Sequence, residues 1–400
     1  MALWDELTGQ AEVIATVRAA AEAPVDDARD TLAHSWLITG PPGSGRSTLA
    51  YAFAAALLSR SGGDPVTDQQ VGARTHPDLG VLSTERVVIS IDEVRRLVST
   101  SQFSPSVGRY RVMVIEDADR MTERTSNVLL KALEEPPPRT VWILCAPSEA
   151  DLLPTIRSRV RVVRLRVPSV PEVADLIERR DGVSRPDAER AAREAQSHIG
   201  MAHRLATSDE ARQRRARTLQ LALGIRSASG AVLAAAELLE VADADAKAIT
   251  AERDEEERAS TLRSLGVEPG GTVPPALRAQ LKALEEDQKR RATRSLRDGL
   301  DRILVDLLSL YRDILLLQLG VGSEPVNLAI YGELEAAARE STPARTLATL
   351  DAIAVARERI EGNVAPALAL EAMLVGAVRR PPSDRAEASA DRGRPSRPRS

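Results

Sequence analysis

Residues 36–47 read Trp36-Leu-Ile-Thr-Gly40-Pro-Pro-Gly-Ser-Gly45-Arg46-Ser47, the most informative segment of this 400-residue chain. The segment begins as an apolar strand, passes through a glycine-rich loop and continues into an Ala- and Leu-rich helical pattern. A phosphate-binding loop needs glycines whose N–H groups turn inward, a helix N-terminus facing the anion, and a Ser or Thr for magnesium. The spacing therefore predicts a P-loop, with a plain glycine turn as the alternative.

One position departs from the P-loop pattern. The pattern requires a lysine whose compact ammonium reaches the outer phosphates, and this chain has Arg46 there. A planar guanidinium does not replace an ammonium at such a site. We therefore expect a vestigial or weak nucleotide site without nucleotide hydrolysis.

The second candidate part of a nucleotide site is a pair of acids after the apolar run Val112–Ile115. The run ends at Glu116 and Asp117, where an ATPase carries its metal-binding and water-activating carboxylates. A solvated acidic strand end is the alternative. The residues expected to form the nucleotide site are Gly40, Pro41, Gly43, Ser44, Gly45, Arg46, Ser47, Glu116 and Asp117.

The order of elements predicts an α/β fold. Apolar strands at 35–39, 76–82, 112–115, 140–146 and 160–167 alternate with helical patterns at 90–100 and 122–135. Such alternation is typical of a doubly wound parallel sheet with helices on both faces. Residues 59–74 are rich in Ser, Gly, Asp and Gln, so we expect an exposed connection without a core face.

The rest of the chain is predicted to be helical. We expect four segments: the P-loop domain at 1–167, an all-α three-helix lid at 168–218, an all-α collar at 219–380, and a disordered tail at 381–400. A basic cluster at 289–297 alternates with acids, which favours a solvated face over a DNA contact.

Composition excludes several classes of protein. The net charge of −4 gives no bulk attraction to nucleic acid. The single cysteine, Cys145, excludes a disulfide framework and a cysteine-rich zinc site. The most apolar run, 303–319, holds three charges and predicts a buried helix rather than a membrane span. With no leader-like N-terminus, we expect a cytoplasmic protein.

Two arginines close the α/β region. The segment Thr155-Ile-Arg157-Ser158-Arg159 is predicted to be a short helical element between two strands. Two guanidinium groups so close together cannot both be buried without partners. A surface arginine is the alternative to a functional one.

Taken together, four motifs resemble one family. They are Gly40-Pro-Pro-Gly-Ser-Gly-Arg-Ser47, Val114-Ile-Glu-Asp-Ala-Asp-Arg120, Asn127-Val-Leu-Leu-Lys-Ala-Leu-Glu-Glu-Pro136 and Ser158-Arg159. This set is similar to the delta-prime family of bacterial DNA polymerase III clamp-loader subunits, in an actinobacterial form. The resemblance implies an AAA+ module, a lid and a collar that assembles with the delta and tau/gamma subunits. It also implies contact with the sliding clamp and primer–template DNA through the complex, in the nucleoid-associated replisome.

The same resemblance implies a role in trans for one arginine. Arg159 matches the arginine that such stator subunits lend to the ATP site of a neighbour, although Val160 replaces the usual cysteine. The family's zinc module is not expected, because residues 59–74 hold no cysteine. We therefore expect no required cofactor and no metal, with ATP and magnesium bound weakly at most.

Departures from the family pattern predict the loss of hydrolysis. Glu116 precedes Asp117, in reverse of the usual order, and the sensor threonine and sensor arginine fall at Ala146-Pro147 and near Gly200. Two rival hypotheses stay open here. One is an active AAA+ ATPase of the tau/gamma or junction-helicase type, and the other is a plain scaffold without a catalytic part.

Overall fold

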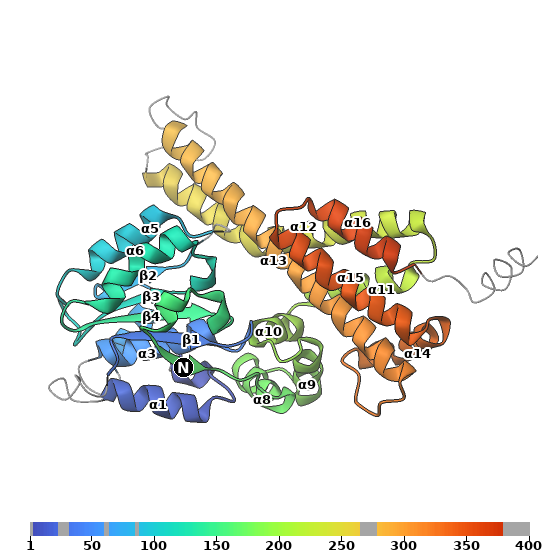
Figure 1. The fold of residues 1–400 in the computed structure, drawn as a ribbon, viewed down its shortest axis with the longest axis horizontal. Helices are drawn as coiled ribbons and strands as arrows, with labels where there is room; N and C mark the ends of the chain where they lie inside the picture. Colours follow the sequence, from blue (N-terminus) through green and yellow to red (C-terminus); the bar gives the residue numbers. More distant parts are fainter. Residues whose placement is uncertain (1–2, 23–31, 60–63, 85–87, 265–277, 379–400) are drawn as a thin grey trace, which may run out of the picture. The chain divides into compact units, whose positions relative to one another are not determined.

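The computed structural model describes residues 3–22, 32–59, 64–84, 88–264 and 278–378. The chain divides into two compact units, Met1–Thr207 and Ser208–Ser400. Figure 1 labels most of the helices and strands.

The first unit is built on a five-stranded parallel sheet. The strands are β1 (Ser35–Thr39), β2 (Leu79–Leu82), β3 (Arg111–Ile115), β4 (Thr140–Ala146) and β5 (Arg161–Arg164). Their order across the sheet is β2-β3-β4-β1-β5, and every pairing is parallel. The carboxyl ends of all five strands therefore lie at one edge, which positions the residues after β1 and β3 on the same side. The predicted parallel sheet is confirmed.

Helices cover both faces of this sheet. One face packs on α1 (Ala11–Glu22) and α3 (Arg46–Leu58), and its core includes Trp36 and Phe53 at 5.0 Å between ring centroids. The other face packs on α5 (Ile91–Ser101) and α6 (Glu123–Glu134) around Trp142. The remaining elements of the unit are η1 (Leu3–Glu6), α4 (Pro65–Gly72), η2 (Ala118–Arg120), η3 (Glu149–Asp151), α7 (Pro154–Arg157), α8 (Val170–Asp181), α9 (Arg185–Glu194) and α10 (Ile199–Thr207).

Local signals set the helix ends. Ser90 caps α5 in a capping box with Glu93, whose carboxylate accepts from the Ser90 N–H at 2.8 Å. Thr122 caps α6, and the prolines at 136–138 prevent the helix from continuing. The predicted starts of both helices are confirmed.

The expectation for residues 59–74 was wrong in one respect. Helix α4 forms within this stretch, with Asp64 as its N-cap and Pro65 in its first turn. Thr67 and Val71 are buried at i, i+4 spacing, so the segment does have a core face. The Asp-Pro pair is a helix-start signal that the polar composition obscured.

In the second unit, every regular element among the described residues is a helix. Its elements are α11 (Asp209–Gly224), α12 (Ala228–Ser264), α13 (Arg278–Gln318), η5 (Leu328–Ile330), α14 (Tyr331–Glu340), α15 (Pro343–Glu361) and α16 (Pro366–Gly376). The apolar run predicted to be a buried helix lies in α13, where Leu304, Leu307 and Leu310 are buried. No helix among the described residues is long and apolar enough to cross a membrane.

The predicted division into segments stays a prediction. The boundary expected at residue 218 falls inside α11, which runs from Asp209 to Gly224. The boundary between the two compact units lies at Thr207 and Ser208. The tail predicted at 381–400 lies outside the described residues.

Candidate functional site

The glycine loop leaves β1 and enters α3 as predicted. Gly43 and Gly45 have φ of +77° and +93°, values that favour glycine. A Cβ on Gly43 would lie 2.2 Å from the ring of His198, and the Ile199 N–H donates to the Gly43 carbonyl at 3.2 Å. The loop backbone is therefore that of a P-loop whose second glycine is covered by the start of α10.

The Arg46 side chain is hydrogen-bonded within its own loop. Its Nη1 donates to the carbonyl oxygen of Gly40, on the same loop. The neighbouring Ser44 hydroxyl is buried and has no hydrogen-bond partner among the described residues. The Arg46 guanidinium, which replaces the phosphate-binding ammonium of a P-loop, thus stabilises the loop itself. A lysine has a shorter side chain and would not make the same contact with the Gly40 carbonyl.

Glu116 is held by two partners that come from α3 and from the segment just after α4. Arg74 Nη2 lies 2.7 Å from Glu116 Oε1, and the Tyr51 hydroxyl donates to the same oxygen. The Arg74 guanidinium also lies 5.3 Å from the Tyr51 ring centroid. The Glu116 side chain is only 13% exposed, so its charge is neutralised within the unit. Burial, followed by the charge of Glu116, raises the pKa of Tyr51, which keeps its proton on the hydroxyl.

The other acids at the end of β3 point elsewhere. Asp117 lies 3.8 Å from Arg120, one turn along η2. Burial raises the pKa of Asp119, while the charge of Arg46 lowers it in part. Glu116 and Asp117 thus contact different arginines of the unit. Among the described residues, no group of three or more His, Cys, Asp and Glu side chains could hold a metal.

The predicted nucleotide residues thus fit a triphosphate with magnesium poorly. The glycine loop is present, but Arg46 is bonded to Gly40 and Glu116 is bonded to Arg74 and Tyr51. Tyr51, Arg74 and His198 were not predicted to be parts of this region. Arg74 lies in a stretch that looked like a surface connection, and nothing in its sequence context pointed to Glu116.

The second predicted site lies just after α7. The Nε of Arg159 donates to Glu134 Oε1 at 2.6 Å, and Nη2 contacts the same oxygen. Its Nη1 donates to the Thr155 carbonyl at 2.7 Å and to the Ser158 hydroxyl at 3.1 Å. The side chain is still 34% exposed, so this ion pair lies at the surface of the unit.

Neighbouring arginines differ from Arg159 in their contacts. Arg157 is exposed and makes no ion pair or hydrogen bond with other described side chains. The Arg161 guanidinium lies over the Trp36 ring, 4.8 Å from its centroid. Arg159 thus differs from Arg157 in being fixed by a carboxylate at the surface.

Residues 24–169 match the family described as DNA polymerase III, delta subunit. This match covers less than half of the chain. The delta-prime subunit of Pseudomonas aeruginosa is 35% identical over 166 residues, which are 40% of this chain and 45% of that protein. The Escherichia coli delta-prime subunit is 34% identical over 143 residues, 34% of this chain and 43% of that protein. The chain thus matches less than half the length of these relatives, and over that length the predicted delta-prime resemblance is confirmed.

Other DNA polymerase III proteins are similar to this chain at lower identity. The gamma/tau subunit of Mycobacterium tuberculosis is 30% identical over 161 residues, 38% of this chain and 27% of that protein. A solved structure of a gamma subunit-related protein from Thermotoga maritima aligns with 91% of this chain and 98% of that one, at 18% identity and a TM-score of 0.45. The family match, the parallel sheet and the glycine loop together confirm the predicted AAA+ α/β fold of the first unit.

The two predicted sensor positions carry no matching side chains. Pro147 uses its carbonyl to accept from the Gly40 N–H at 3.2 Å, which ties the end of β4 to the start of the glycine loop. Gly200 lies beside His198, because a Cβ added to Gly200 would lie 3.5 Å from that ring. Neither residue supplies the hydroxyl or the guanidinium that a nucleotide-sensing role requires.

The basic cluster on α13 is engaged within the helical unit. Arg291 is buried and bonds to Asp254 and Glu257 of α12. The other three arginines of the cluster each contact an acid or an amide: Arg290 with Glu286, Arg294 with Asp298, and Arg297 with Asn363. These contacts favour the interpretation of a paired helix face over that of a DNA contact.

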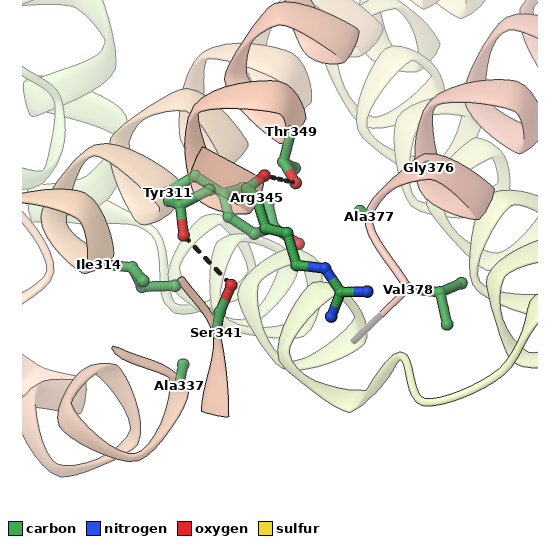
Figure 2. Close-up of a pocket in the computed structure, with 10 residues that line it drawn as sticks. Tyr311, Ile314, Ala337, Ser341, Arg345, Thr349, Gly376, Ala377 and Val378 are labelled. Carbon is green, nitrogen blue, oxygen red and sulfur yellow. Dashed lines mark hydrogen bonds between the residues drawn. The ribbon is translucent and has the colours of Figure 1, made fainter. Parts of the chain in front are cut away.

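A pocket in the helical unit is a separate feature of the molecule. Figure 2 shows Arg345 extending between Ser341 and Val378. The Thr349 hydroxyl donates to the Arg345 carbonyl at 3.1 Å. The pocket has no glycine loop and is not part of the nucleotide region. It is lined by Tyr311, Ile314, Ala337, Ser341, Arg345, Thr346, Thr349, Gly376, Ala377 and Val378.

Proposed function

We propose that this chain is a delta-prime-type stator subunit of a DNA polymerase III clamp loader. It supports ATP-driven loading of the sliding clamp onto primed DNA and hydrolyses little or no ATP itself. Its partners are delta and tau/gamma subunits, and it meets the clamp and primer–template DNA through the assembled complex in the cytoplasmic replisome. It requires neither zinc nor another cofactor.

The observation that carries this proposal is the engagement of Glu116. A carboxylate that must bind magnesium needs an oxygen that faces the phosphates. Arg74 and Tyr51 both occupy Glu116 Oε1, and the side chain is largely buried. Nucleotide with magnesium would have to displace both partners and also turn Arg46 away from Gly40. The energetic penalty of these rearrangements argues against turnover.

The contribution to catalysis lies at Arg159 instead. An arginine from a neighbouring subunit stabilises the charge that develops on the γ-phosphate in the transition state. Arg159 lies at the surface, beyond the end of a short helix, and its partner Glu134 is 44% exposed. Because exposed ion pairs contribute little net free energy, this guanidinium can add phosphate contacts at low cost.

The test begins with two measurements of ATP turnover. The purified chain alone is expected to show background ATPase activity with or without primed DNA. Addition of the chain to delta and tau/gamma subunits of the same organism is expected to raise DNA-stimulated ATPase and clamp loading. Brisk turnover by the isolated chain would support the rival hypothesis of an active ATPase. A loader whose activity is the same with and without the chain would overturn the proposal.

A further inference from the structure

The carboxylate of Glu134 is the charged partner of the predicted trans-acting arginine. It belongs to the last residue of α6, and one of its oxygens accepts from Nε of Arg159 and forms an ion pair with Nη2. The two residues are 25 positions apart and lie on different elements. We propose that Glu134 is a positioning residue that holds the Arg159 guanidinium in the orientation needed by a neighbour's ATP site. This inference rests on the proposed function of Arg159.

Helix stability does not account for an acid at this position. The C-terminus of a helix carries a partial negative charge and favours cations. Glu134 is the last residue of α6, and Glu135 is its C-cap. Within the described part of the chain, Arg159 is the only charged partner of the Glu134 side chain. This ion pair therefore explains an acid at a position where the helix itself would favour a cation.

The backbones on both sides of the pair are firmly held. Leu133 is buried just before Glu134, and the prolines at 136–138 restrict the chain just after it. On the other side, Ile156 is fully buried and anchors α7, and the Arg159 N–H donates to its carbonyl at 2.9 Å. The pair therefore joins two rigid supports at an exposed surface, an arrangement that orients a side chain.

The contacts also define which part of the guanidinium stays available. Nε and one Nη2 hydrogen face Glu134, while Nη1 faces Thr155 and Ser158. Arginine has five N–H donors, and the second Nη2 hydrogen has no partner among the described residues. A phosphate oxygen that approaches Nη2 meets a side chain whose rotamer is already set. Preorganisation of this kind removes the entropic penalty of ordering a long side chain at the interface.

Glu135 offers a matched control for Glu134. It is the next residue, it is exposed and acidic, and it has no ion pair with described residues. In the loader assembled from this chain with delta and tau/gamma subunits, Glu134→Ala is expected to lower the DNA-stimulated kcat for ATP roughly 3- to 10-fold. Glu134→Gln keeps an acceptor oxygen and is expected to lose less, while Glu135→Ala leaves kcat unchanged. KM for ATP stays the same in all three, because the neighbour binds the nucleotide.

A double-mutant cycle separates positioning from a general structural effect. If Glu134 acts through Arg159, then Glu134→Ala in an Arg159→Ala background causes no further loss of kcat. Thermal unfolding of each variant checks that the fold is intact. A kcat of Glu134→Ala equal to or above that of the wild type, or an added loss in the Arg159→Ala background, would overturn this inference alone. An Arg159→Ala variant with full activity would overturn the proposed function as well.

Discussion

The nucleotide region, with Arg46 and Glu116, and the surface just after α7, with Arg159 and Glu134, both combine an arginine with a carboxylate. The two regions differ in how far the carboxylate is exposed to solvent. In the loop region, Arg46 and Glu116 are bonded to partners of the same unit, and Glu116 is 13% exposed. On the surface just after α7, the Arg159 and Glu134 side chains are 34% and 44% exposed. Removal of one partner strongly destabilises a buried pair, whereas an exposed pair contributes little net free energy. Both charged groups of the Arg159–Glu134 pair therefore reach the surface, whereas the Glu116 carboxylate does not.

The largest effect is expected from Arg159→Ala, which tests the difference between the two regions. In the assembled loader, ATP turnover at the site next to this subunit is expected to fall about 10³-fold, because the transition-state charge loses its guanidinium. Single-turnover ATP hydrolysis with primed DNA measures the effect. Arg157→Ala is the matched control, since Arg157 is exposed on the same short segment and lacks the Glu134 contact. Equal losses for both variants would contradict the assignment.

A buried ion pair in the first unit shows how much such a pair can contribute to the stability of the fold. Asp78 is fully buried, pairs with Arg111 at 3.0 Å and accepts from the N–H groups of residues 106–108. Burial raises its pKa, but the hydrogen bonds from Gly108, Ser106 and Val107 outweigh this and lower the pKa to about 2.

The consequence is a loss of stability in acid. Because the folded pKa lies below the unfolded value, Asp78 stabilises the fold fully above about pH 4, and about 2.5 kcal/mol is lost as the pH falls through 2. Urea unfolding at a series of pH values measures this slope. Asp78→Asn is expected to unfold at lower urea and to lack this part of the slope. An identical slope in the variant would show that other carboxylates dominate.

A smaller effect on stability is expected from the contact between Tyr51 and Glu116. Tyr51→Phe removes the hydroxyl that donates to Glu116 and keeps the ring beside Arg74. A hydrogen bond to a charged group contributes about 1.5 kcal/mol to the free energy of unfolding, at the low end here because Arg74 remains. Denaturant unfolding of the isolated chain measures the change. An unchanged midpoint would mean that Tyr51 does not hold Glu116 in solution.

The smallest effect is expected from restoring the P-loop lysine. Arg46→Lys alone leaves Glu116 bonded to Arg74 and Tyr51, so ATP turnover of the isolated chain stays at background. Addition of Arg74→Ala releases one partner of Glu116 and is expected to give the greater gain in Mg-ATP affinity. Fluorescent-nucleotide titration compares the two variants. Turnover in Arg46→Lys alone would show that the lysine was the single defect.

Prediction from sequence was accurate where the signals are local. Ser90 marks the start of α5 because an N-cap serine acts on the next few residues, and the glycine loop is defined by its own spacing. Apolar runs such as Val112–Ile115 indicate central parallel strands, since both of their faces are covered. The helix at Pro65–Gly72 was missed, because the polar composition around it outweighed its Asp-Pro start.

Long-range partners could not be predicted in this way. The chain order alone accounts for the P-loop, the parallel sheet and the presence of arginines after α7, because periodicity, caps and spacing are encoded in neighbouring residues. Folding in three dimensions places Arg74 on Glu116 and Glu134 on Arg159, residues that are far apart in the chain. Only packing of the helices on the sheet sets how far water reaches each of these pairs, and that exposure separates a neutralised carboxylate from an available guanidinium.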